Sequence, residues 1–417
     1  MIPDRPSPAI VDLTDPDLFA DGIPAELFAT LRRESPVLWT DAPAEWPAEV
    51  GRGQWNLLRA ADIRKVSRDW ETFSSARGGI MMDNRDAGGL EIIRETLLGK
   101  DPPEHTRQRN ILDNAFAPRR VTRLEDMVRT TIERHLDAFI AGGPGDIVEG
   151  FTKKVPLDVI CDVLGIPEPD RPKVFAWAQS VVASDDPEQI RLYGRPEESR
   201  RRAYEYVEGL LAERSRCPAD DLATFFTTAT VDGGPVPDDH RIGLFRQLFE
   251  AGADTTMNTM TAGIKALSDH PDQWQLLRED RSLVPSAVEE MLRWASAVVY
   301  FRRTATCDVE VGGQLIREGD AVVMWYASGN RDEAAFDRPD TFDVTREKCP
   351  HFAFGGGGRH FCVGASLARL ELRLMLEALL DRVPDLRVAG PMRRTRSNIV
   401  LGVTELPVTF SAPQGTS

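Results

Sequence analysis

The sequence predicts a mainly α fold with a small β-rich part. Residues 121–215 carry successive helical apolar patterns separated by Pro and Gly, and residues 238–268 carry one longer helical pattern. The alternation that favours strands is concentrated in three stretches, residues 37–60, residues 298–326 and a predicted hairpin at residues 396–410. No internal repeat or low-complexity linker divides the chain, so a single domain over residues 1–417 is expected.

The composition narrows the class of protein. The chain has 417 residues, of which 41% are hydrophobic and 28% are charged, as in ordinary soluble domains. It has no 18-residue apolar run and no signal segment at its start, so we expect no membrane anchor and a cytoplasmic location. Five scattered cysteines fit a reducing compartment. With 51 basic and 66 acidic residues, the net charge of −15 argues against nucleic acid as a partner.

The long helical pattern at residues 238–268 contains unusual residues at its middle. It would be capped by Asp238, and at 1.5 Å per residue it would be roughly 45 Å long. Gly252 and Thr255 are locally unfavourable inside a helix, which indicates that another constraint selects them. Gln247 and Glu250 lie one turn earlier on or near the same face. These two side chains either point toward solvent and other helices or present polar groups to a ligand.

A glycine-rich segment before a predicted helix carries Cys362. The glycines 355–358 allow a tight turn and a close approach of the backbone to a flat partner. The positive end of the following helix would favour the thiolate of Cys362. Three interpretations remain for this cysteine at this point: a buried structural thiol, a zinc ligand together with Cys349, His351 and His360, or a thiolate ligand of haem iron.

The segment resembles the haem-binding loop of the cytochrome P450 superfamily, through Phe354, Gly358, His360, Cys362 and Gly364. The family pattern Phe-x-x-Gly-x-x-x-Cys-x-Gly places Phe seven residues before Cys, whereas Phe354 is eight residues before Cys362. The additional glycine is similar to that of a bacterial branch of steroid and methyl-branched lipid hydroxylases. The resemblance covers roughly residues 15–410 and implies a soluble, single-domain P450 fold with haem b and Cys362 as the metal ligand.

The same resemblance implies roles for other residues of the site. His105 and Arg109, in Asp-Pro-Pro-Glu-His-Thr-Arg-Gln-Arg, and Arg303 would bind the haem propionates, with Arg302 as the alternative to Arg303. Asp254 and Thr255 would form the acid and alcohol pair that delivers protons to oxygen. The remaining haem contacts that it implies are Ala251, Gly252, Phe354, Gly355 and His360. The substrate pocket that it implies is lined by Ile80, Met81, Met82, Val182, Gln247, Glu250, Ala251, Val298, Val299, Ile399 and Val400.

Glu290 and Arg293 are similar to a structural Glu-x-x-Arg pair of this family. The third partner of that pair is commonly an Arg or His at the position occupied here by Thr341. Arg338 or Arg346 could replace it.

The resemblance implies a haem-thiolate monooxygenase that inserts one atom of O2 into a small hydrophobic molecule, such as a steroid, terpenoid, lipid or secondary metabolite. Electrons would come from a ferredoxin and its reductase, steered to a basic patch on an otherwise acidic protein. The residues of that patch would be Arg107, Arg119, Arg120, Arg359, Arg369 and Arg373. Two alternatives remain, a P450 that couples or desaturates its substrate and a haem-thiolate sensor without turnover.

Overall fold

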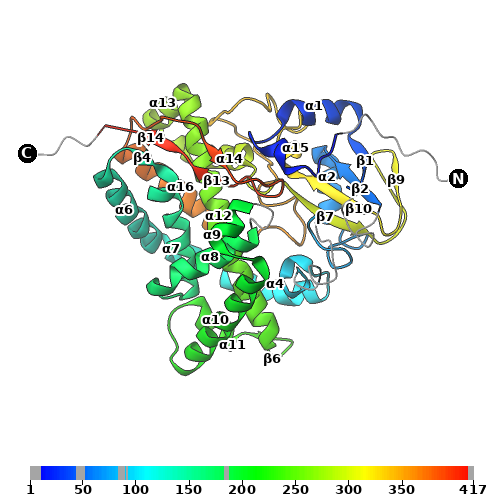
Figure 1. Cartoon of the computed structure of the whole chain (residues 1–417), viewed down its shortest axis with the longest axis horizontal. Helices are drawn as coiled ribbons and strands as arrows, with labels where there is room; N and C mark the ends of the chain where they lie inside the picture. The colour runs from blue at the N-terminus through cyan, green and yellow to red at the C-terminus, as the bar shows by residue number, and fades with distance from the viewer. Residues whose placement is uncertain (1–10, 44–51, 83–89, 91–92, 183–186, 412–417) are drawn as a thin grey trace, which may run out of the picture.

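The computed structural model describes residues 11–43, 52–82, 90, 93–182 and 187–411. It has the predicted mainly α architecture, with a β-rich part at one end and a larger helical part at the other (Figure 1). The principal helices are α1 (Ala25–Glu34), α2 (Ala60–Arg68), α4 (Glu104–Ala115), α5 (Pro118–Arg123), α6 (Glu125–Gly142), α7 (Lys154–Leu164), α8 (Arg171–Val182), α9 (Pro187–Tyr193), α10 (Pro196–Arg216), α11 (Leu222–Thr228), α12 (Asp238–Asp269), α13 (Pro271–Glu279), α14 (Val284–Ala295), α15 (Tyr326–Gly329) and α16 (Ala365–Arg382).

The β-rich part contains a five-stranded sheet in the order β1-β2-β10-β7-β3. Its strands are β1 (Val37–Asp41), β2 (Gly53–Leu57), β3 (Phe73–Ser74), β7 (Tyr300–Ala305) and β10 (Ala321–Trp325). Only the β2–β10 pair is parallel. Because successive side chains alternate between the faces of a sheet, Val322 and Met324 pack in the core cluster that contains α2 residues, whereas Val323 and Trp325 pack in the cluster that contains α1 residues.

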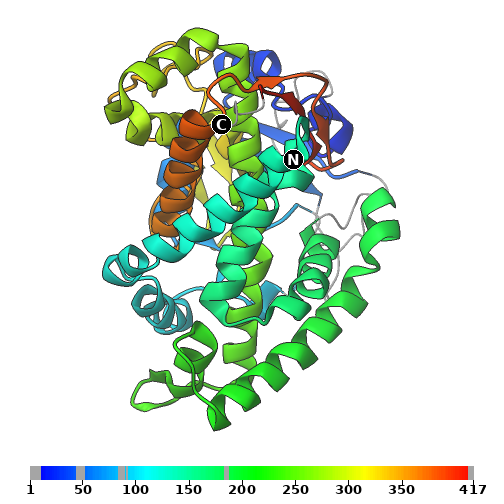
Figure 2. The ribbon, with the colours of Figure 1, turned by 90° about the vertical axis from the view of Figure 1, so that its left-hand side faces the viewer.

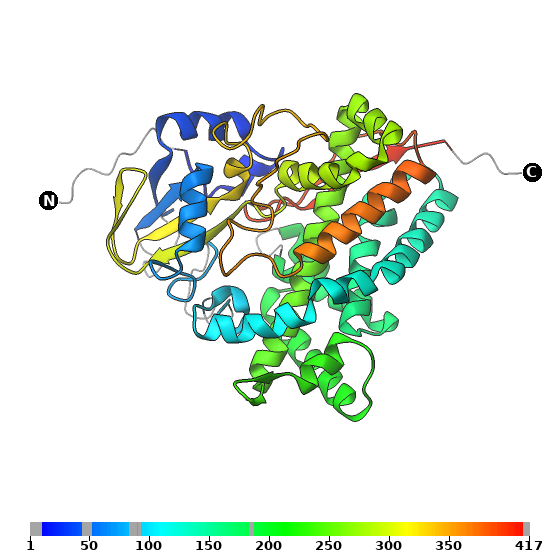
Figure 3. The ribbon, with the colours of Figure 1, turned by 180° about the vertical axis from the view of Figure 1, so that it is seen from behind.

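The central helix α12 runs through the helical part and is covered by other helices on several sides (Figure 2). It contacts α7, α8, α10, α14 and α16, which explains why most of its residues are buried. Behind it, α16 and α6 lie side by side (Figure 3). The helix spans 32 residues, close to the predicted length, but Pro237 occupies the N-cap position and Asp238 lies in the first turn, where it pairs with Arg241. The predicted cap is therefore wrong by one residue.

The predicted hairpin at residues 396–410 is also wrong. The C-terminal hairpin instead pairs β12 (Arg393–Arg394) with β13 (Val403–Glu405). The following strand, β14 (Pro407–Thr409), pairs with β11 (Arg387–Val388) and β4 (Gly145–Asp146). Residues 396–402 form the connection, because the Ser397 hydroxyl accepts the backbone N–H groups of Ile399 and Val400 and thereby satisfies them locally. The short remaining pairs are β5 (Thr230–Val231) with β6 (Gly234–Pro235) and β8 (Val309–Val311) with β9 (Gln314–Ile316).

The open question about the partner of Glu290 and Arg293 has a clear structural answer. Both side chains are fully buried, and Arg293 donates to both carboxylate oxygens of Glu290 at 2.8 and 2.7 Å. Arg346 supplies the third contact, with its Nε 3.0 Å from Glu290 Oε2, whereas Arg338 pairs at the surface with Asp343. The network joins α14 to the segment that leads into the Cys362 loop.

Candidate active site

The Cys362 loop turns tightly because glycine occupies its left-handed positions. Gly355, Gly357 and Gly358 have φ angles of +91°, +89° and +78°. A Cβ on Gly358 would lie 2.8 Å from the backbone oxygen of Ser67, so the loop packs against α2 in a way that other residues would prevent. The backbone N–H of Cys362 donates to the carbonyl of Phe354 at 3.0 Å, which closes the loop just before α16 begins.

The electrostatics of Cys362 differ in part from the prediction. Burial raises the pKa of the Cys362 thiol, and backbone N–H groups of Gly364 and Ala365 oppose this effect without reversing it. The start of α16 therefore does act on the sulfur, but the protein alone does not favour the thiolate. The side chain nevertheless retains accessible surface. An accessible sulfur with a raised pKa fits a metal ligand, because a bound metal ion deprotonates a coordinating thiol.

The zinc interpretation does not survive the geometry. Cys349 lies 3.5 Å from the backbone oxygen of Glu289, and the Nε2 of His351 lies 3.1 Å from a carboxylate oxygen of the same residue. Both potential ligands are thus engaged with α14 rather than with Cys362. Within the described part of the chain, no group of three or more His, Cys, Asp or Glu residues could hold a metal ion.

Four predicted propionate-binding and loop residues, His105, Arg109, Arg303 and His360, come together in one partly buried cluster. The rings of His105 and His360 have centroids 4.3 Å apart. Burial lowers the pKa of His105 to about 4, and the positive charges of Arg109, Arg359 and Arg303 act in the same direction. Burial and the charge of Arg303 also lower the pKa of His360. The histidines are therefore neutral mainly because they are buried, and the arginine charges beside them are suited to binding an anion.

Two of these side chains are left without the partners that buried polar groups normally have. His105 is 1% exposed, and neither of its ring nitrogens makes a hydrogen bond. Arg303 is 4% exposed and donates to the carbonyl of Arg302, yet no ion pair with it occurs among the described residues. Arg109 pairs with Asp113 at 2.7 Å and donates to the carbonyl of Phe361 in the Cys362 loop. These unsatisfied donors fit the carboxylates of a bound haem.

The middle of α12 is continuously helical and contains the small residues Ala251 and Gly252. Ala251 is exposed although its helix is otherwise mainly buried, and the Thr255 hydroxyl donates to the Ala251 carbonyl at 3.0 Å. Gly252 has a packing role, since a Cβ on it would lie 2.9 Å from Cγ1 of Ile160 on α7. The small residues thus serve two purposes, an accessible spot at Ala251 and close contact with α7 at Gly252.

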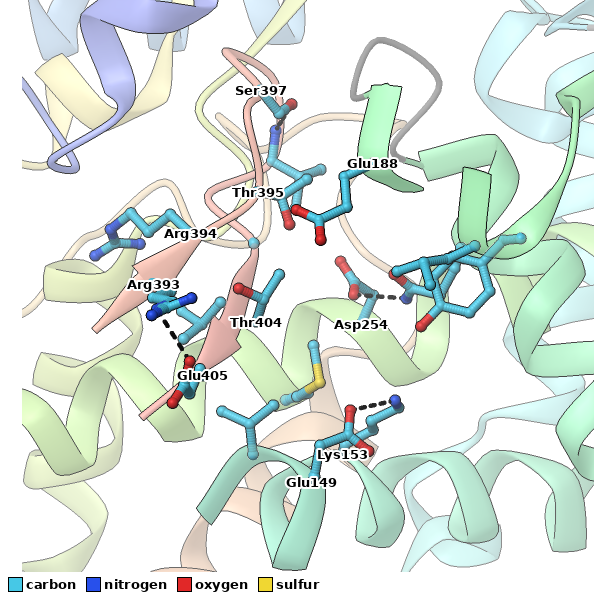
Figure 4. Close-up of a pocket in the computed structure, with 18 of the residues that line it drawn as sticks. Glu149, Lys153, Glu188, Asp254, Arg393, Arg394, Thr395, Ser397, Thr404 and Glu405 are labelled. Carbon is cyan, nitrogen blue, oxygen red and sulfur yellow. Dashed lines mark hydrogen bonds and ion pairs between the residues drawn. The ribbon is translucent and has the colours of Figure 1, made fainter. Parts of the chain in front are cut away.

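Asp254 is held by amide groups rather than by a cation. Its carboxylate oxygens accept hydrogen bonds from Gln179 of α8 and Asn258 of α12, each at 2.9 Å. Burial raises the pKa of Asp254, although both hydrogen bonds lower it. The carboxylate points into a polar cavity of about 340 Å³ between α9, α12 and the β12–β13 hairpin (Figure 4). Lys153, Glu149 and other charged side chains line this cavity, so Asp254 on α12 borders a polar space.

The predicted pocket residues fall into different environments. Ile80, Met82, Val299 and Ile399 are buried and, except for Ile80, belong to one core cluster. Met81, Val298 and Val400 are partly buried, and Val298 forms an isolated β-bridge with Val400. The side chain of Val182 lies outside the described part of the structure.

Gln247 and Glu250 have protein partners. Gln247 Oε1 accepts the backbone N–H of Leu97 at 2.8 Å, and Glu250 forms an ion pair with Arg246 at 3.1 Å. Leu97 lies in a short 3-10 helix, η3 (Leu97–Gly99). Arg246 and Gln179 were not identified from the sequence. Gln179 contacts Asp254, which is distant in sequence, and the direction of the Arg246 side chain toward Glu95 cannot be read from helical spacing.

The cysteine loop, the cluster of His105, Arg109 and Arg303, and the exposed Ala251 on the central helix are the features expected of a haem-thiolate protein. The sequence model of the family described as cytochrome P450 matches residues 197–383. The chain is 38% identical to the steroid C26-monooxygenase of Rhodococcus jostii, over 97% of this chain and 85% of that protein. It is 37% identical to the linalool 8-monooxygenase of Pseudomonas putida, over 95% of this chain and 98% of that protein.

A solved structure has the same architecture. The Mycobacterium marinum cytochrome P450 CYP268A2 in complex with pseudoionone superimposes with a TM-score of 0.91 at 38% identity, covering 98% of this chain and all of that one. The chain therefore belongs to the cytochrome P450 family. It is a haem-iron monooxygenase that oxidises hydrophobic molecules with O2. In the described residues, no helix is long and apolar enough to cross a membrane.

Proposed function

We propose that this P450 uses haem b to hydroxylate an apolar isoprenoid-derived substrate, of the steroid or terpenoid class, in the cytoplasm. Relatives with these two kinds of substrate in their names align over nearly the whole chain, and all five cysteines are free, as expected in a reducing compartment. When bound, haem supplies reductive activation of O2 for insertion into a C–H bond. The residues of the chain hold this group, exclude competing ligands and move protons.

Cys362 would hold the iron as its thiolate ligand. His105, Arg109 and Arg303 would bind the two haem carboxylates, which satisfy the free nitrogens of His105 and neutralise the buried guanidinium of Arg303. Phe354, Gly355 and His360 would form the wall on the cysteine side. Ala251 would leave the opposite side open for O2 and the substrate.

Asp254 and Thr255 would move protons on that open side. Burial raises the pKa of Asp254 above that of an ordinary aspartate, so the carboxyl holds a proton more readily, which suits general acid catalysis. Asp254 borders the polar cavity of Figure 4, so water there could reprotonate it. The Thr255 hydroxyl donates to a helix carbonyl and could instead donate to a ligand beside Ala251.

The apolar character of the substrate rests on one observation: Gln247 and Glu250 are engaged by Leu97 and Arg246. Breaking either contact to bind a polar substrate would leave a partner unsatisfied. The polar face that could have favoured a hydrophilic secondary metabolite is therefore already occupied. Ile80, Met81, Val298 and Val400 remain the proposed apolar wall.

The experiment is a titration of the purified ferric protein with cholestenone and, separately, with pseudoionone, followed at the Soret band. A low-to-high-spin shift with cholestenone supports a steroid substrate, and a shift with pseudoionone alone supports a shorter isoprenoid. A haem spectrum that does not change with either compound would refute the proposed substrate class.

Cys362→Ser should abolish the thiolate-type spectrum, whereas Cys349→Ser should preserve it. If the spectrum persists in both variants, the assignment of Cys362 as the iron ligand is wrong. Product analysis with an electron donor distinguishes hydroxylation from coupling, desaturation or sensing.

Electrons would come from a ferredoxin and its reductase through an arginine surface near the cysteine loop. Three of the proposed patch residues are engaged: Arg107 with Asp232, Arg369 with Glu289, and Arg373 with Glu125 and Glu377. The exposed Arg119, Arg120 and Arg359 have no ion pair among the described residues. Arg119→Glu with Arg359→Glu should slow reduction by an acidic ferredoxin, whereas Arg278→Glu on α13 should leave it unchanged. Equal rates in all variants would exclude this surface.

A further inference from the structure

Residues 93–100 lie between α12 and α4. The backbone N–H of Leu97 donates to Gln247 of α12 at 2.8 Å. At the other end the side chain of Lys100 forms an ion pair with Glu104 of α4 at 2.9 Å. The segment is thus attached both to the central helix and to α4, and Gln247 lies one turn from the accessible Ala251.

A charged cluster fastens the same segment a second time. Arg246 of α12 is 3% exposed, and its guanidinium lies 3.3 Å from a carboxylate oxygen of Glu95 and 3.1 Å from one of Glu250. Glu95 belongs to the segment and Glu250 to α12, so one buried cation joins the two elements. A buried guanidinium needs such partners, because an uncompensated charge there is costly.

The backbone of the segment also lies directly on α12. A Cβ on Gly243 would lie 2.6 Å from the carbonyl oxygen of Glu95, closer than any real side chain tolerates. Arg246 and Gln247 lie three and four residues after Gly243, and Glu250 lies four and three residues after them, so the four residues share a face of the helix. This face is built to receive the segment through backbone contact, an amide and a charge.

We propose that Arg246 is a positioning residue, which together with Gln247 and Gly243 seats residues 93–100 against α12 as the wall that closes over an apolar substrate. This inference rests on the proposed function for the identity of the ligand, but the seating itself does not. Packing of residues 93–100 against α12 raises substrate affinity, since the apparent affinity is proportional to the population of the binding-competent state. It does not touch the reacting atoms, so the chemistry after binding is unaffected.

The seat should also respond to pH. Burial raises the pKa of Glu250 to about 7, with Arg246 and Arg200 opposing and Glu95 reinforcing the shift. The other titratable groups beside Glu250 in its small cavity are Asp254 and Cys161. Burial raises the pKa of both, so Cys161 stays a neutral thiol. Below pH 7 Glu250 is neutral and does not repel Glu95; above pH 7 its negative charge repels the carboxylate of Glu95 beside their shared partner Arg246. The segment should therefore be seated more firmly at pH 6 than at pH 8.

The test combines amide hydrogen exchange of the haem-loaded protein with substrate titration. Arg246→Met should speed exchange across residues 93–99 about tenfold and raise the dissociation constant for cholestenone or pseudoionone about tenfold, the change expected if the seated population falls to about one tenth. Turnover at saturating substrate should stay within about twofold of the wild type, as expected of a purely ground-state effect. Arg246→Lys should recover part of both effects.

Two further variants separate seating from general damage. Gly243→Ala removes no charge but forces the Glu95 carbonyl away, and it should reproduce the faster exchange. Lys265→Met deletes an ion pair with Asp269 near the other end of α12 and should change neither quantity. Unchanged exchange in both Arg246→Met and Gly243→Ala would overturn the proposal. If the wild type binds neither cholestenone nor pseudoionone, the proposed substrate class is wrong. The hydrogen-exchange result still tests whether Arg246 holds residues 93–100 against α12.

Discussion

Replacing Arg346 by methionine tests the network that ties the cysteine-loop approach to α14. Arg346 is the only partner of the Glu290–Arg293 pair that the sequence left undecided, and methionine preserves most of its apolar stem. The guanidinium donates to Glu290 at 3.0 Å and to the backbone oxygen of Asp337 at 2.7 Å. Its remaining donors reach the carbonyls of Arg338 and Thr341 at 3.3 and 3.2 Å.

The magnitude follows from what Glu290 retains. After the substitution, Glu290 keeps both hydrogen bonds from Arg293 and accepts the backbone N–H of Asp343 at 2.9 Å. Glu290 should therefore lose one charge-assisted hydrogen bond, which costs about 1.5–3 kcal/mol, rather than bear the full cost of an unpaired buried charge. The three hydrogen bonds from Arg346 to backbone carbonyls lie at exposed positions, where water can replace the guanidinium. Arg293→Met removes the principal cation instead, and it should cost about 3–5 kcal/mol.

The assay is guanidinium-induced unfolding of the haem-loaded protein, followed by circular dichroism and at the Soret band. Arg338→Met is the matched control, since Arg338 is 61% exposed and its pairs with Asp337 and Asp343 lie at the surface. It should change the free energy of unfolding by about 0.5 kcal/mol or less. Equal destabilisation by Arg346→Met and Arg338→Met would refute the assignment of Arg346 as the third partner.

Three other predictions follow from the site and its surroundings. Asp254→Asn should reduce turnover about 10²- to 10⁴-fold while leaving the substrate dissociation constant unchanged, measured by steady-state kinetics and Soret titration. Glu250→Gln should abolish the weakening of substrate binding between pH 6 and pH 8, since an amide cannot acquire the negative charge that repels Glu95. If the pH dependence persists in this variant, another group causes it. Burial raises the pKa of Glu289, but hydrogen bonds from Arg369 and His351 outweigh it and lower this pKa to about 2. The stability that ionised Glu289 contributes is therefore fully present above about pH 4.5 and should fall as the pH approaches 2. Glu289→Gln should flatten that part of the dependence of the free energy of unfolding on pH.

The parts of the fold that local backbone chemistry determines were predicted well from the sequence. Helix starts and stops at Pro and Gly, the apolar alternation of the sheet and the glycine turn before Cys362 depend on neighbouring residues only. The predicted tail hairpin was wrong because the apolar run at residues 399–401 suggests a strand, whereas the N–H groups of Ile399 and Val400 donate to the hydroxyl of Ser397. A side chain that competes for backbone hydrogen bonds is hard to recognise within an apolar run.

The direction of the polar side chains on α12 could not be predicted from the sequence, for a different reason. Helical spacing placed Gln247 and Glu250 near the face of Ala251, and this much is correct. Whether they meet a ligand or the protein depends on residues 93–100, whose approach is fixed by Gly243 and Arg246 and by no local signal. The choice between Arg338 and Arg346 depended in the same way on the folding of a loop.

The polar residues of α12 hold different neighbouring elements along the length of the helix. Arg246, Gln247 and Glu250 serve residues 93–100. Asn258 donates to Asp254 and accepts the backbone N–H of Val403 at 2.8 Å, so it orients the carboxylate and fastens the β12–β13 hairpin at once. Because these side chains are engaged by other elements, the proposed function leaves the exposed Ala251 and the nearby hydroxyl of Thr255 to face a bound molecule. A substrate at that position would then be recognised by shape and apolar contact, with specificity set by the elements that these polar residues hold in place.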